Sequence, residues 1–570
     1  MARTPLLTAL RKLAREHTQA FDEGRSIDEV RERRAEASLK EKAPPTEFSR
    51  RKFLLGAAAA GVPTALGLRF AQKAWAQSAP RVAIIGGGIS GLSAALTLRD
   101  AGYRATIYEA LPNRVGGRML SDTPTSPGCG SCHTVTRPAA YPWLDSQESD
   151  VFGEFVDSNH TTMRALATRF GIPLIDLLAA EPAGSTETYH FFGNHYRKAD
   201  ADADFSDIYR TLRADLSSAG YPTTYASSKP GGRALDNMSI YSWIESRVPG
   251  GHGSPLGQLL DAAYAIEYGA DTREQSALNL IYLLAYQSRQ SLSVFGESDE
   301  RFRLQGGAGS LPKAISQYLG TNDTRLGWVL ESIQRRSDGA YTLTFDAQGR
   351  QVVTADYVVL TVPFAAMMNV DYASAGFDAL KDRAIRELGA GKNGKLHLQF
   401  TNRLWNQPGP WGIGNGTTYA DTGYQSGWDV SRGQAGASGI LCKYTGGSPV
   451  DLLQQRHFYG THERSDVLAD AAEFLREIEP VFPGLTARWN GRAAGSIAHL
   501  NPYWNCSYSF WGVGQYQAFS GYEGVRQGNV FFAGEHTSQD FQGFMEGGAS
   551  TGVAAANQLL GAMRGRGRAA

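Results

Sequence analysis

The chain of 570 residues lacks several features that mark whole classes of protein. It has 56 basic and 56 acidic side chains, so it lacks the overall basic excess that is typical of nucleic-acid-binding proteins. Its four cysteines are too few for a disulfide framework in a chain of this length. After residue 76 no apolar run reaches the roughly 18 residues of a membrane span, so we expect no stable membrane insertion.

Hydrophobic residues and glycine, in contrast, are plentiful. Hydrophobic residues make up 42% of the chain, enough for a large core divided into two or three packing units. The 65 glycines exceed the usual share of roughly 7%. This excess indicates many tight turns and places where the backbone approaches a ligand closely.

The neutral total conceals a difference between the first 76 residues and the rest. Residues 1–76 carry 15 basic and 9 acidic side chains, a net charge of +6, and the remainder has a net charge of −6. Arg50 and Arg51 precede an apolar stretch reaching Leu68, and Ala74-Trp75-Ala76 follows as a small-x-small cleavage site. This layout predicts a twin-arginine export signal in residues 1–76 and a periplasmic or secreted protein that loads its cofactor before export. A buried N-terminal helix is the alternative.

The beginning of a βαβ unit follows this leader. Residues 81–85 are apolar and β-branched, as in a buried parallel strand, and lead into Gly-Gly-Gly-Ile-Ser-Gly at residues 86–91. In such a motif Gly86 permits the turn, Gly88 lets the backbone approach a pyrophosphate, and Gly91 lets helix and strand pack closely. Glu109, after the second strand, stands where an acid accepts hydrogen bonds from ribose hydroxyls. The spacing predicts a dinucleotide site but does not separate FAD from NAD.

Four motifs in the correct order resemble those of the flavin amine oxidase family. They are the βαβ unit, Arg114-Val115-Gly116-Gly117-Arg118, the strand at residues 355–363 that ends in proline, and the paired segments 530–535 and 543–549. The resemblance implies an α/β fold with a Rossmann-like FAD-binding domain built from discontinuous segments, a mixed-sheet substrate domain and a helical region. The boundaries we expect are 77–152, 300–365 and 510–565 for the FAD-binding domain, 153–200 and 366–509 for the substrate-binding domain, and 201–299 for the helical region.

The same resemblance implies FAD as the cofactor and assigns the residues that bind it. Glu535 would bind pyrophosphate or ribityl oxygens, Met545 would present its backbone N–H to the isoalloxazine ring, and Leu330 loosely matches a position that contacts adenine. The full set we expect is Gly86, Gly88, Ser90, Gly91, Glu109, Ala110, Gly116, Gly117, Arg118, Met119, Phe155, Leu330, Gly534, Glu535 and Met545.

Three residues are expected, by resemblance, to act at the reacting end of the flavin. Lys395, with Trp405 ten residues on, matches the family lysine that holds a water beside flavin N5, and Lys392 is its competitor. Tyr516 and Phe544 match the two aromatic residues of a cage that holds the amine and favours its neutral form. Core packing would explain either aromatic residue alone.

The sequence is less decisive about which amine is oxidised. A substrate carboxylate is usually held by an arginine fork, but no arginine stands in Gly153-Glu154-Phe155-Val156, where many amino acid oxidases have it. Trp428 lies nearest to the place of the tyrosine that assists this arginine and would shape the pocket. The leader and the segment 153–160 resemble a bacterial group of L-amino acid oxidases, which implies conversion of an L-amino acid and O2 to a 2-oxo acid, ammonia and hydrogen peroxide. Monoamine or polyamine oxidase activity, or an amino acid dehydrogenase with another acceptor, stays open.

The remaining features of the sequence suggest neither a metal nor a macromolecular partner. Cys129-Gly130-Ser131-Cys132-His133 has the form of a haem attachment site, but no cytochrome-sized region surrounds it, which favours a local disulfide or free thiols. No second Cys-x-x-Cys or histidine pair completes a zinc site, so we expect no metal. The expected partners are small molecules, with no nucleic acid, and a homodimer stays open.

Overall fold

The computed structural model describes residues 80–124 and 141–567. The expected leader, together with Cys129 and Cys132, lies outside these residues. The prediction of an export signal and the alternatives for the Cys-x-x-Cys-His motif are therefore not addressed by the structure.

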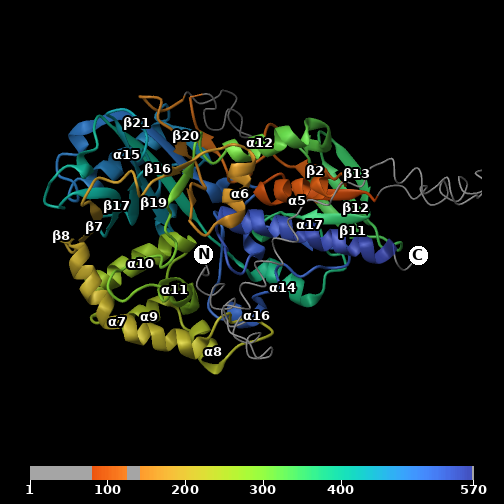
Figure 1. The fold of residues 1–570 in the computed structure, drawn as a ribbon, viewed down its shortest axis with the longest axis horizontal. Helices are drawn as coiled ribbons and strands as arrows, with labels where there is room; N and C mark the ends of the chain where they lie inside the picture. Colours follow the sequence, from red (N-terminus) through yellow and green to blue (C-terminus); the bar gives the residue numbers. More distant parts are fainter. Residues whose placement is uncertain (1–79, 125–140, 568–570) are drawn as a thin grey trace, which may run out of the picture. The chain divides into compact units, whose positions relative to one another are not determined.

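A five-stranded parallel sheet in the order β10-β2-β1-β14-β23 forms the first layer of the fold (Figure 1). Ile84 of β1 pairs with Ile107 of β2 and with Val359 of β14, and Val359 pairs in turn with Phe531 of β23. The side chains of β1 and β14 are buried throughout, as expected of short β-branched runs at the centre of a parallel sheet. The strands are β1 (Val82–Ile85), β2 (Thr106–Glu109), β10 (Thr324–Leu326), β14 (Tyr357–Leu360) and β23 (Val530–Phe532).

Two helices from opposite ends of the described chain pack together beside this sheet. Helix α5 (Ile89–Asp100) follows β1, and helix α17 (Met545–Gly567) lies against it (Figure 1). Their close approach requires glycine, because a Cβ on Gly552 would lie 2.1 Å from the carbonyl oxygen of Ser90. Helices α6 (Thr161–Arg169) and α12 (Ser310–Leu319) and an antiparallel sheet of β11 (Val329–Arg335), β12 (Tyr341–Asp346) and β13 (Arg350–Ala355) complete this part.

An eight-stranded mixed sheet in the order β20-β21-β16-β19-β18-β17-β7-β8 forms the second large layer. Its pairs are antiparallel except for β17 and β7, which are parallel. Strand β16 lies between β21 and β19 and is buried along its whole length. The strands are β7 (Thr186–Phe191), β8 (Asn194–Tyr196), β16 (Asn393–Phe400), β17 (Gly414–Ala420), β18 (Ser426–Asp429), β19 (Gly439–Gly446), β20 (Tyr459–Thr461) and β21 (Trp489–Ile497), with α15 (Ser465–Ile478) packed on β21 and β16.

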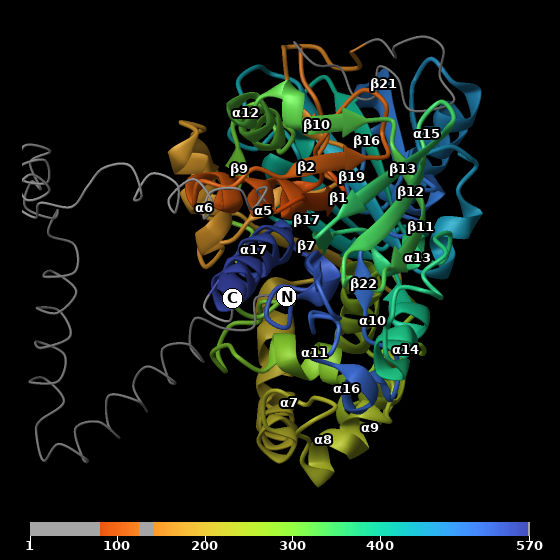
Figure 2. The same ribbon diagram turned by 90° about the vertical axis from the view of Figure 1, so that its right-hand side faces the viewer.

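A helical region gathers apart from the parallel sheet (Figure 2). It consists of α7 (Lys198–Ala219), α8 (Pro230–Asp236), α9 (Ile240–Arg247), α10 (Pro255–Tyr268) and α11 (Ala277–Leu284). Every side chain of α11 is buried. In the part of the chain that the structure describes, no helix has the length and apolar character needed to cross a membrane.

Short elements connect these layers. They are β3 (Ser121–Asp122), β4 (Ser149–Asp150), β5 (Phe155–Val156), β6 (Leu174–Asp176), β9 (Phe302–Leu304), α13 (Phe364–Met367), α14 (Ala379–Glu387), β15 (Gly389–Ala390), β22 (Ser509–Phe510) and α16 (Gln515–Phe519). The predicted fold class is confirmed: a parallel sheet assembled from separated segments, a mixed sheet and a helical region are all present. The boundaries between the three expected domains remain a prediction.

Candidate functional site

A cavity of about 1000 Å³ is lined by the first βα turn, the segment around β5, the mixed sheet and the start of α17. Its size lies at the upper end of the range for ligand pockets, roughly 300–1,000 Å³. The structure brings most of the expected residues to its wall: Gly86, Gly88, Ser90, Glu109, Ala110, Gly116, Gly117, Arg118, Met119, Phe155, Leu330, Lys395, Trp428, Gly534, Glu535, Phe544 and Met545. Gly91 and Tyr516 do not line the cavity.

The glycine loop after β1 has the geometry of a phosphate cradle. Gly86 has a positive φ of 105°, and a Cβ on Gly91 would lie 2.0 Å from the Gly86 carbonyl oxygen, so Gly91 allows the close helix contact rather than lining the cavity. A Cβ on Gly88 would meet no atom within 4 Å. Ser90 Oγ, in the first turn of α5, is buried without a hydrogen-bond partner. An open backbone, an unpaired hydroxyl and a helix N-terminus together suit an anion.

Glu109, at the end of β2, is held by the loop that it faces. Its carboxylate accepts a hydrogen bond from the backbone N–H of Gly87 at 2.6 Å and another from Leu111 N–H at 2.8 Å. Burial raises the pKa of this carboxyl above its usual value, although the two N–H groups oppose the shift. The acid is therefore fixed at the cavity wall, in the position expected of a ribose acceptor.

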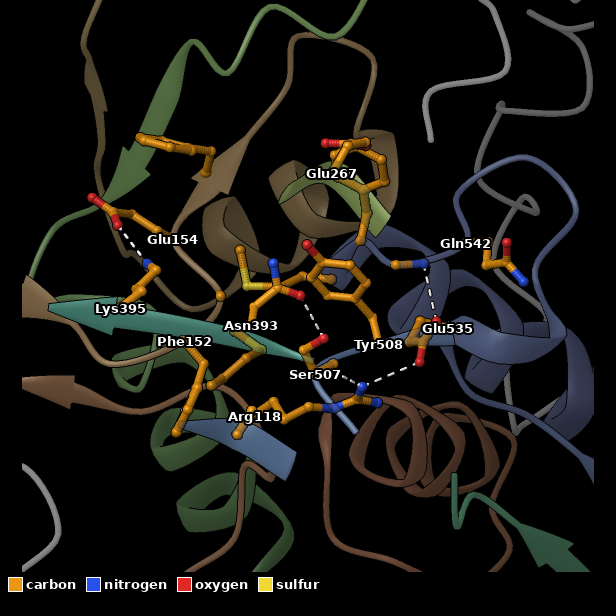
Figure 3. A pocket seen from close by; sticks show the side chains of 18 of the residues that line it. Arg118, Phe152, Glu154, Glu267, Asn393, Lys395, Ser507, Tyr508, Glu535 and Gln542 are labelled. Atoms are coloured by element: carbon orange, nitrogen blue, oxygen red, sulfur yellow. Dashed lines mark hydrogen bonds and ion pairs between the residues drawn. The ribbon is translucent and has the colours of Figure 1, made fainter. Parts of the chain in front are cut away.

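Arg118 connects the second glycine motif to the C-terminal segment (Figure 3). Its Nη1 donates to Glu535 Oε1 at 3.1 Å and to the Ser507 carbonyl at 2.5 Å. Burial opposes the charge of Glu535, but Arg118, His536 and the hydrogen bonds from Ser509 and Gly543 act together against it and keep the pKa of Glu535 below its usual value. Glu535 also accepts hydrogen bonds from the Ser509 hydroxyl and from Gly543 N–H. This pair ties together three segments that are distant in sequence.

Lys395 lies on β16 and faces the cavity with a partner that the sequence did not reveal. Its Nζ donates to Glu154 Oε2 at 2.8 Å and to the Asp150 carbonyl at 3.3 Å (Figure 3). Both side chains of the ion pair are buried, 7% exposed for Lys395 and 3% for Glu154. The Trp428 ring lies 5.0 Å from Nζ. Lys392, the competing lysine, instead forms an exposed pair with Asp451.

The structure places Tyr516 away from the cavity wall. Tyr516 is fully buried in the core, where its hydroxyl donates to Asn279 and its ring lies 5.0 Å from that of Trp511. Its helix, α16, is anchored by Asp236, which accepts hydrogen bonds from the backbone N–H groups of Tyr516 and Gln517. Phe544 does line the cavity.

Tyr508, rather than Tyr516, lines the cavity together with Phe544. Its ring lies 3.8 Å from where a Cβ on Gly543 would be, next to Phe544. Its hydroxyl donates to the Ile266 carbonyl at 2.6 Å and is 3.0 Å from the Tyr444 hydroxyl. Phe155, expected on the cofactor side, lies with its ring 5.4 Å from that of Trp428.

Away from the glycine loop the cavity is strongly acidic, which sequence reasoning missed. Acids from several elements line it: Glu154, Glu181, Glu187, Asp202, Glu267, Asp299 and Glu300. Each cation on this side has an acid partner, namely Lys395 with Glu154, Arg432 with Glu181, and Lys198 with Asp202. The acids come from distant segments, so spacing in the sequence gave no signal of their convergence.

Burial controls the charge of two of these acids. Burial raises the pKa of Glu267 to about 7, with a smaller contribution from Asp157. Burial and the neighbouring carboxylates raise the pKa of Glu300 well above its usual value. At neutral pH the carboxyl group of Glu267 therefore exists in part in the neutral form, and the environment of Glu300 also favours its neutral form.

The described cysteines and acids do not form a metal centre. Cys442 and Cys506 are free and buried. Within residues 80–124 and 141–567, no group of three or more histidine, cysteine, aspartate or glutamate side chains is arranged to hold a metal ion.

Comparison with known proteins places these features in context. A family model described as flavin containing amine oxidoreductase matches residues 89–560. The protein named Putative L-amino-acid oxidase YobN of Bacillus subtilis is 26% identical over 506 residues, covering 85% of this chain and 95% of its own. Polyamine oxidase 6 of Oryza sativa subsp. japonica is 22% identical, with coverages of 84% and 90%. The structure of cyclohexylamine oxidase from Brevibacterium oxydans has a TM-score of 0.69 at 20% identity, with coverages of 85% and 100%.

Proposed function

Because the chain belongs to the flavin-containing amine oxidoreductase family, we propose that it is an FAD-dependent L-amino acid oxidase. Family membership establishes an oxidoreductase with a flavin cofactor, and the choice of FAD and of an L-amino acid is our proposal. The observation that carries it is the position of Lys395, which with Glu154 forms part of the wall of the same cavity as the glycine loop.

The residues around the glycine loop fit FAD. The unpaired hydroxyl of Ser90 and the open face of Gly88 would receive the pyrophosphate, and Glu109 would receive the ribose hydroxyls. The ion pair of the partly buried Arg118 and the buried Glu535 would lie along the remainder of the dinucleotide. When bound, FAD supplies a two-electron acceptor that takes a hydride from the carbon bearing the amine and passes the electrons to O2.

The residues near Lys395 would handle the amine. The rings of Trp428, Tyr508 and Phe544 line the cavity and would enclose the substrate, exclude water and favour the neutral amine. Lys395, held as one partner of a buried ion pair, would position a water molecule for hydrolysis of the imine product. The balanced overall reaction is L-amino acid, O2 and H2O giving a 2-oxo acid, ammonia and hydrogen peroxide.

A second candidate, oxidation of a diamine or polyamine, is favoured by the acids on the cavity wall. Four acids, Glu187, Glu267, Asp299 and Glu300, remain after each cation there has been matched with an acid partner. A substrate with a second positive charge would complement the ionised members of this group. A basic L-amino acid such as lysine also carries this charge, so the acids alone do not distinguish it from a diamine.

Anaerobic mixing of the purified flavoprotein with L-amino acids, D-amino acids and amines tests the proposal. We expect L-amino acids to bleach the flavin absorbance, and readmitted air to restore it with formation of hydrogen peroxide. Bleaching by cadaverine or spermidine, with none by any L-amino acid, would establish the second candidate instead. Bleaching by L-amino acids without recovery in air would indicate a dehydrogenase with another acceptor.

A further inference from the structure

Two N–H donors on the mixed-sheet side of the cavity have no hydrogen-bond partner among the described residues. Trp428 Nε1 and Arg432 Nε are both buried and unpaired, and both residues line the cavity. A buried donor without an acceptor costs free energy that a ligand can recover. Two such donors in the wall of one cavity, one of them on the charged guanidinium group, favour an anionic ligand.

The two donors come from neighbouring parts of the chain. Trp428 lies on β18, and Arg432 lies in the turn that follows this strand. Thr418 of β17 pairs with Gly427 of β18, so Thr417 is in register with Trp428 across the two strands. Arg432 Nη2 donates to Thr417 Oγ1 at 3.3 Å. The guanidinium group is thus tied to the residue in register with Trp428, whose ring lies 5.0 Å from Lys395 Nζ.

The guanidinium group retains donors for a ligand although it has an acid partner. Arg432 Nη1 donates to Glu181 Oε1 at 2.8 Å, and Nη2 contacts Thr417. Two of its five N–H donors are used in this way, and the one at Nε remains unpaired. The side chain is 11% exposed, so a ligand would meet it in a desolvated site where charge-assisted hydrogen bonds are strong.

We propose that Arg432 and Trp428 bind the carboxylate of the substrate, through Nε–H and Nε1–H respectively. This inference rests on the proposed function, and it supplies the anchor that the segment Gly153–Val156 lacks. Glu300 does not prevent it, because burial and its neighbouring acids favour the neutral form of that carboxyl group.

The test separates carboxylate recognition from amine recognition in the FAD-loaded enzyme. The probes are 3-phenylpropanoate, a carboxylate without an amine, and phenethylamine, an amine without a carboxylate. Their affinities are measured anaerobically by calorimetry.

Trp428→Phe keeps an aromatic ring and removes the N–H, and it should weaken the binding of 3-phenylpropanoate about 3- to 10-fold. Arg432→Met should weaken it about 10- to 100-fold, and Arg432→Lys, which lacks the Nε–H, should restore only part of the loss. Phenethylamine should bind all variants no more weakly than it binds the wild type.

Arg403→Met is the matched control. Arg403 holds the same loop by donating to the carbonyls of Ser431 and Gln434, but it does not line the cavity. It should leave the affinity for 3-phenylpropanoate unchanged, and an equal loss in this variant would attribute the effect to loop distortion and overturn the inference. Equal weakening of both probes by Trp428→Phe and Arg432→Met, or no weakening of either, would also overturn it. If 3-phenylpropanoate binds as expected but no L-amino acid bleaches the flavin, the carboxylate site stands and the proposed function fails.

Discussion

Lys395 and Glu154 form a buried ion pair, with Nζ and Oε2 2.8 Å apart. Lys395 is the expected catalytic lysine, and the pair lines the same cavity as the glycine loop. The ammonium group has three donors, and the structure assigns two of them, to Glu154 and to the Asp150 carbonyl. The pair therefore fixes the amine in one position and leaves one donor for a water molecule or ligand.

Replacing Glu154 by Gln should lower the free energy of unfolding and raise the chemical reactivity of Lys395. An uncompensated buried charge costs about 3–5 kcal/mol in the free energy of unfolding. Because the ion pair with Glu154 that restrains Nζ is lost, Lys395 should react faster with acetic anhydride at pH 8, measured by peptide mass spectrometry. Glu387→Gln, which breaks the exposed pair with Arg383 on α14, is the control and should cost less than about 1 kcal/mol. Unchanged labelling of Lys395 in the Glu154 variant would show that the pair does not restrain the amine.

Removing the ring of Tyr508 should affect substrate binding, whereas removing that of Tyr516 should affect stability. Tyr508→Ala opens the cavity wall beside Phe544, so the affinity for amine substrates should fall while FAD stays bound. Tyr516→Ala leaves a void in the core and should lower the free energy of unfolding by about 3–5 kcal/mol. Chemical denaturation and KM measurements on both variants show which of the two tyrosines contacts the substrate. A KM effect confined to the Tyr516 variant would support the aromatic pair of Tyr516 and Phe544 that the sequence predicts.

The contrast between these two tyrosines shows what the sequence could predict. The glycine loop was predictable because adjacent residues determine its conformation: Gly86 needs a positive φ, and Gly91 must approach the Gly86 carbonyl. The position of Tyr516 was not predictable in this way, because it depends on contacts with Asp236 and Asn279, which lie far away in sequence. No local pattern contains that information.

The acidic side of the cavity was hidden for the same reason. Glu154 immediately precedes β5, and its pairing with Lys395 depends on how β5 and β16 are brought together in three dimensions. Glu267 lies on α10, and Glu300 precedes β9, so their approach follows from the packing of the helical region on the mixed sheet. Charge counts along the chain do not register such convergence.

The preference for a substrate with a second positive charge should rise with pH. Glu267, with a pKa of about 7 because of burial, is neutral below that pH and anionic above it. The ratio of kcat/KM for L-lysine to that for L-norleucine, which lacks the second amine, should therefore increase as the pH passes through about 7. Glu267→Gln should flatten this ratio.

The raised pKa of Glu267 also makes the stability of the protein depend on pH. The folded protein holds the proton of Glu267 more tightly than the unfolded chain does. Glu267 therefore lowers the free energy of unfolding as the pH rises from 4.5, the ordinary pKa of a glutamate, to about 7. Denaturant unfolding should show Glu267→Gln gaining stability over the wild type at pH 8 and not at pH 4. No difference between the two pH values would mean that Glu267 is not perturbed.

We propose that residues 1–76 are a twin-arginine leader, which predicts a dependence of export on Arg50 and Arg51. Replacement of both by lysine keeps the charge and should abolish translocation, so the flavoprotein should accumulate in the cytoplasm with its flavin bound. Cell fractionation followed by flavin absorbance measures this. Replacement of Arg31 and Arg33, outside the motif, by lysine is the control and should leave export intact. Export that persists without the arginine pair would contradict the twin-arginine signal, and retention of the wild type in the cytoplasm would favour the alternative of a buried N-terminal helix.

Substitutions in the glycine loop should separate folding from FAD binding. A Cβ on Gly88 meets no protein atom within 4 Å, so Gly88→Ala should fold like the wild type but bind FAD more weakly, because the methyl group would stand where the pyrophosphate approaches. A Cβ on Gly91 would lie 2.0 Å from the Gly86 carbonyl oxygen, so Gly91→Ala should lower both the affinity for FAD and the free energy of unfolding.

Ser90→Ala removes one hydroxyl donor to a charged phosphate. It should weaken the affinity for FAD about 10-fold or more while leaving the free energy of unfolding of the apoprotein nearly unchanged. FAD titration and denaturant unfolding of the apoproteins measure the two effects separately. Full FAD affinity in both Gly88→Ala and Ser90→Ala would place the pyrophosphate elsewhere in the cavity.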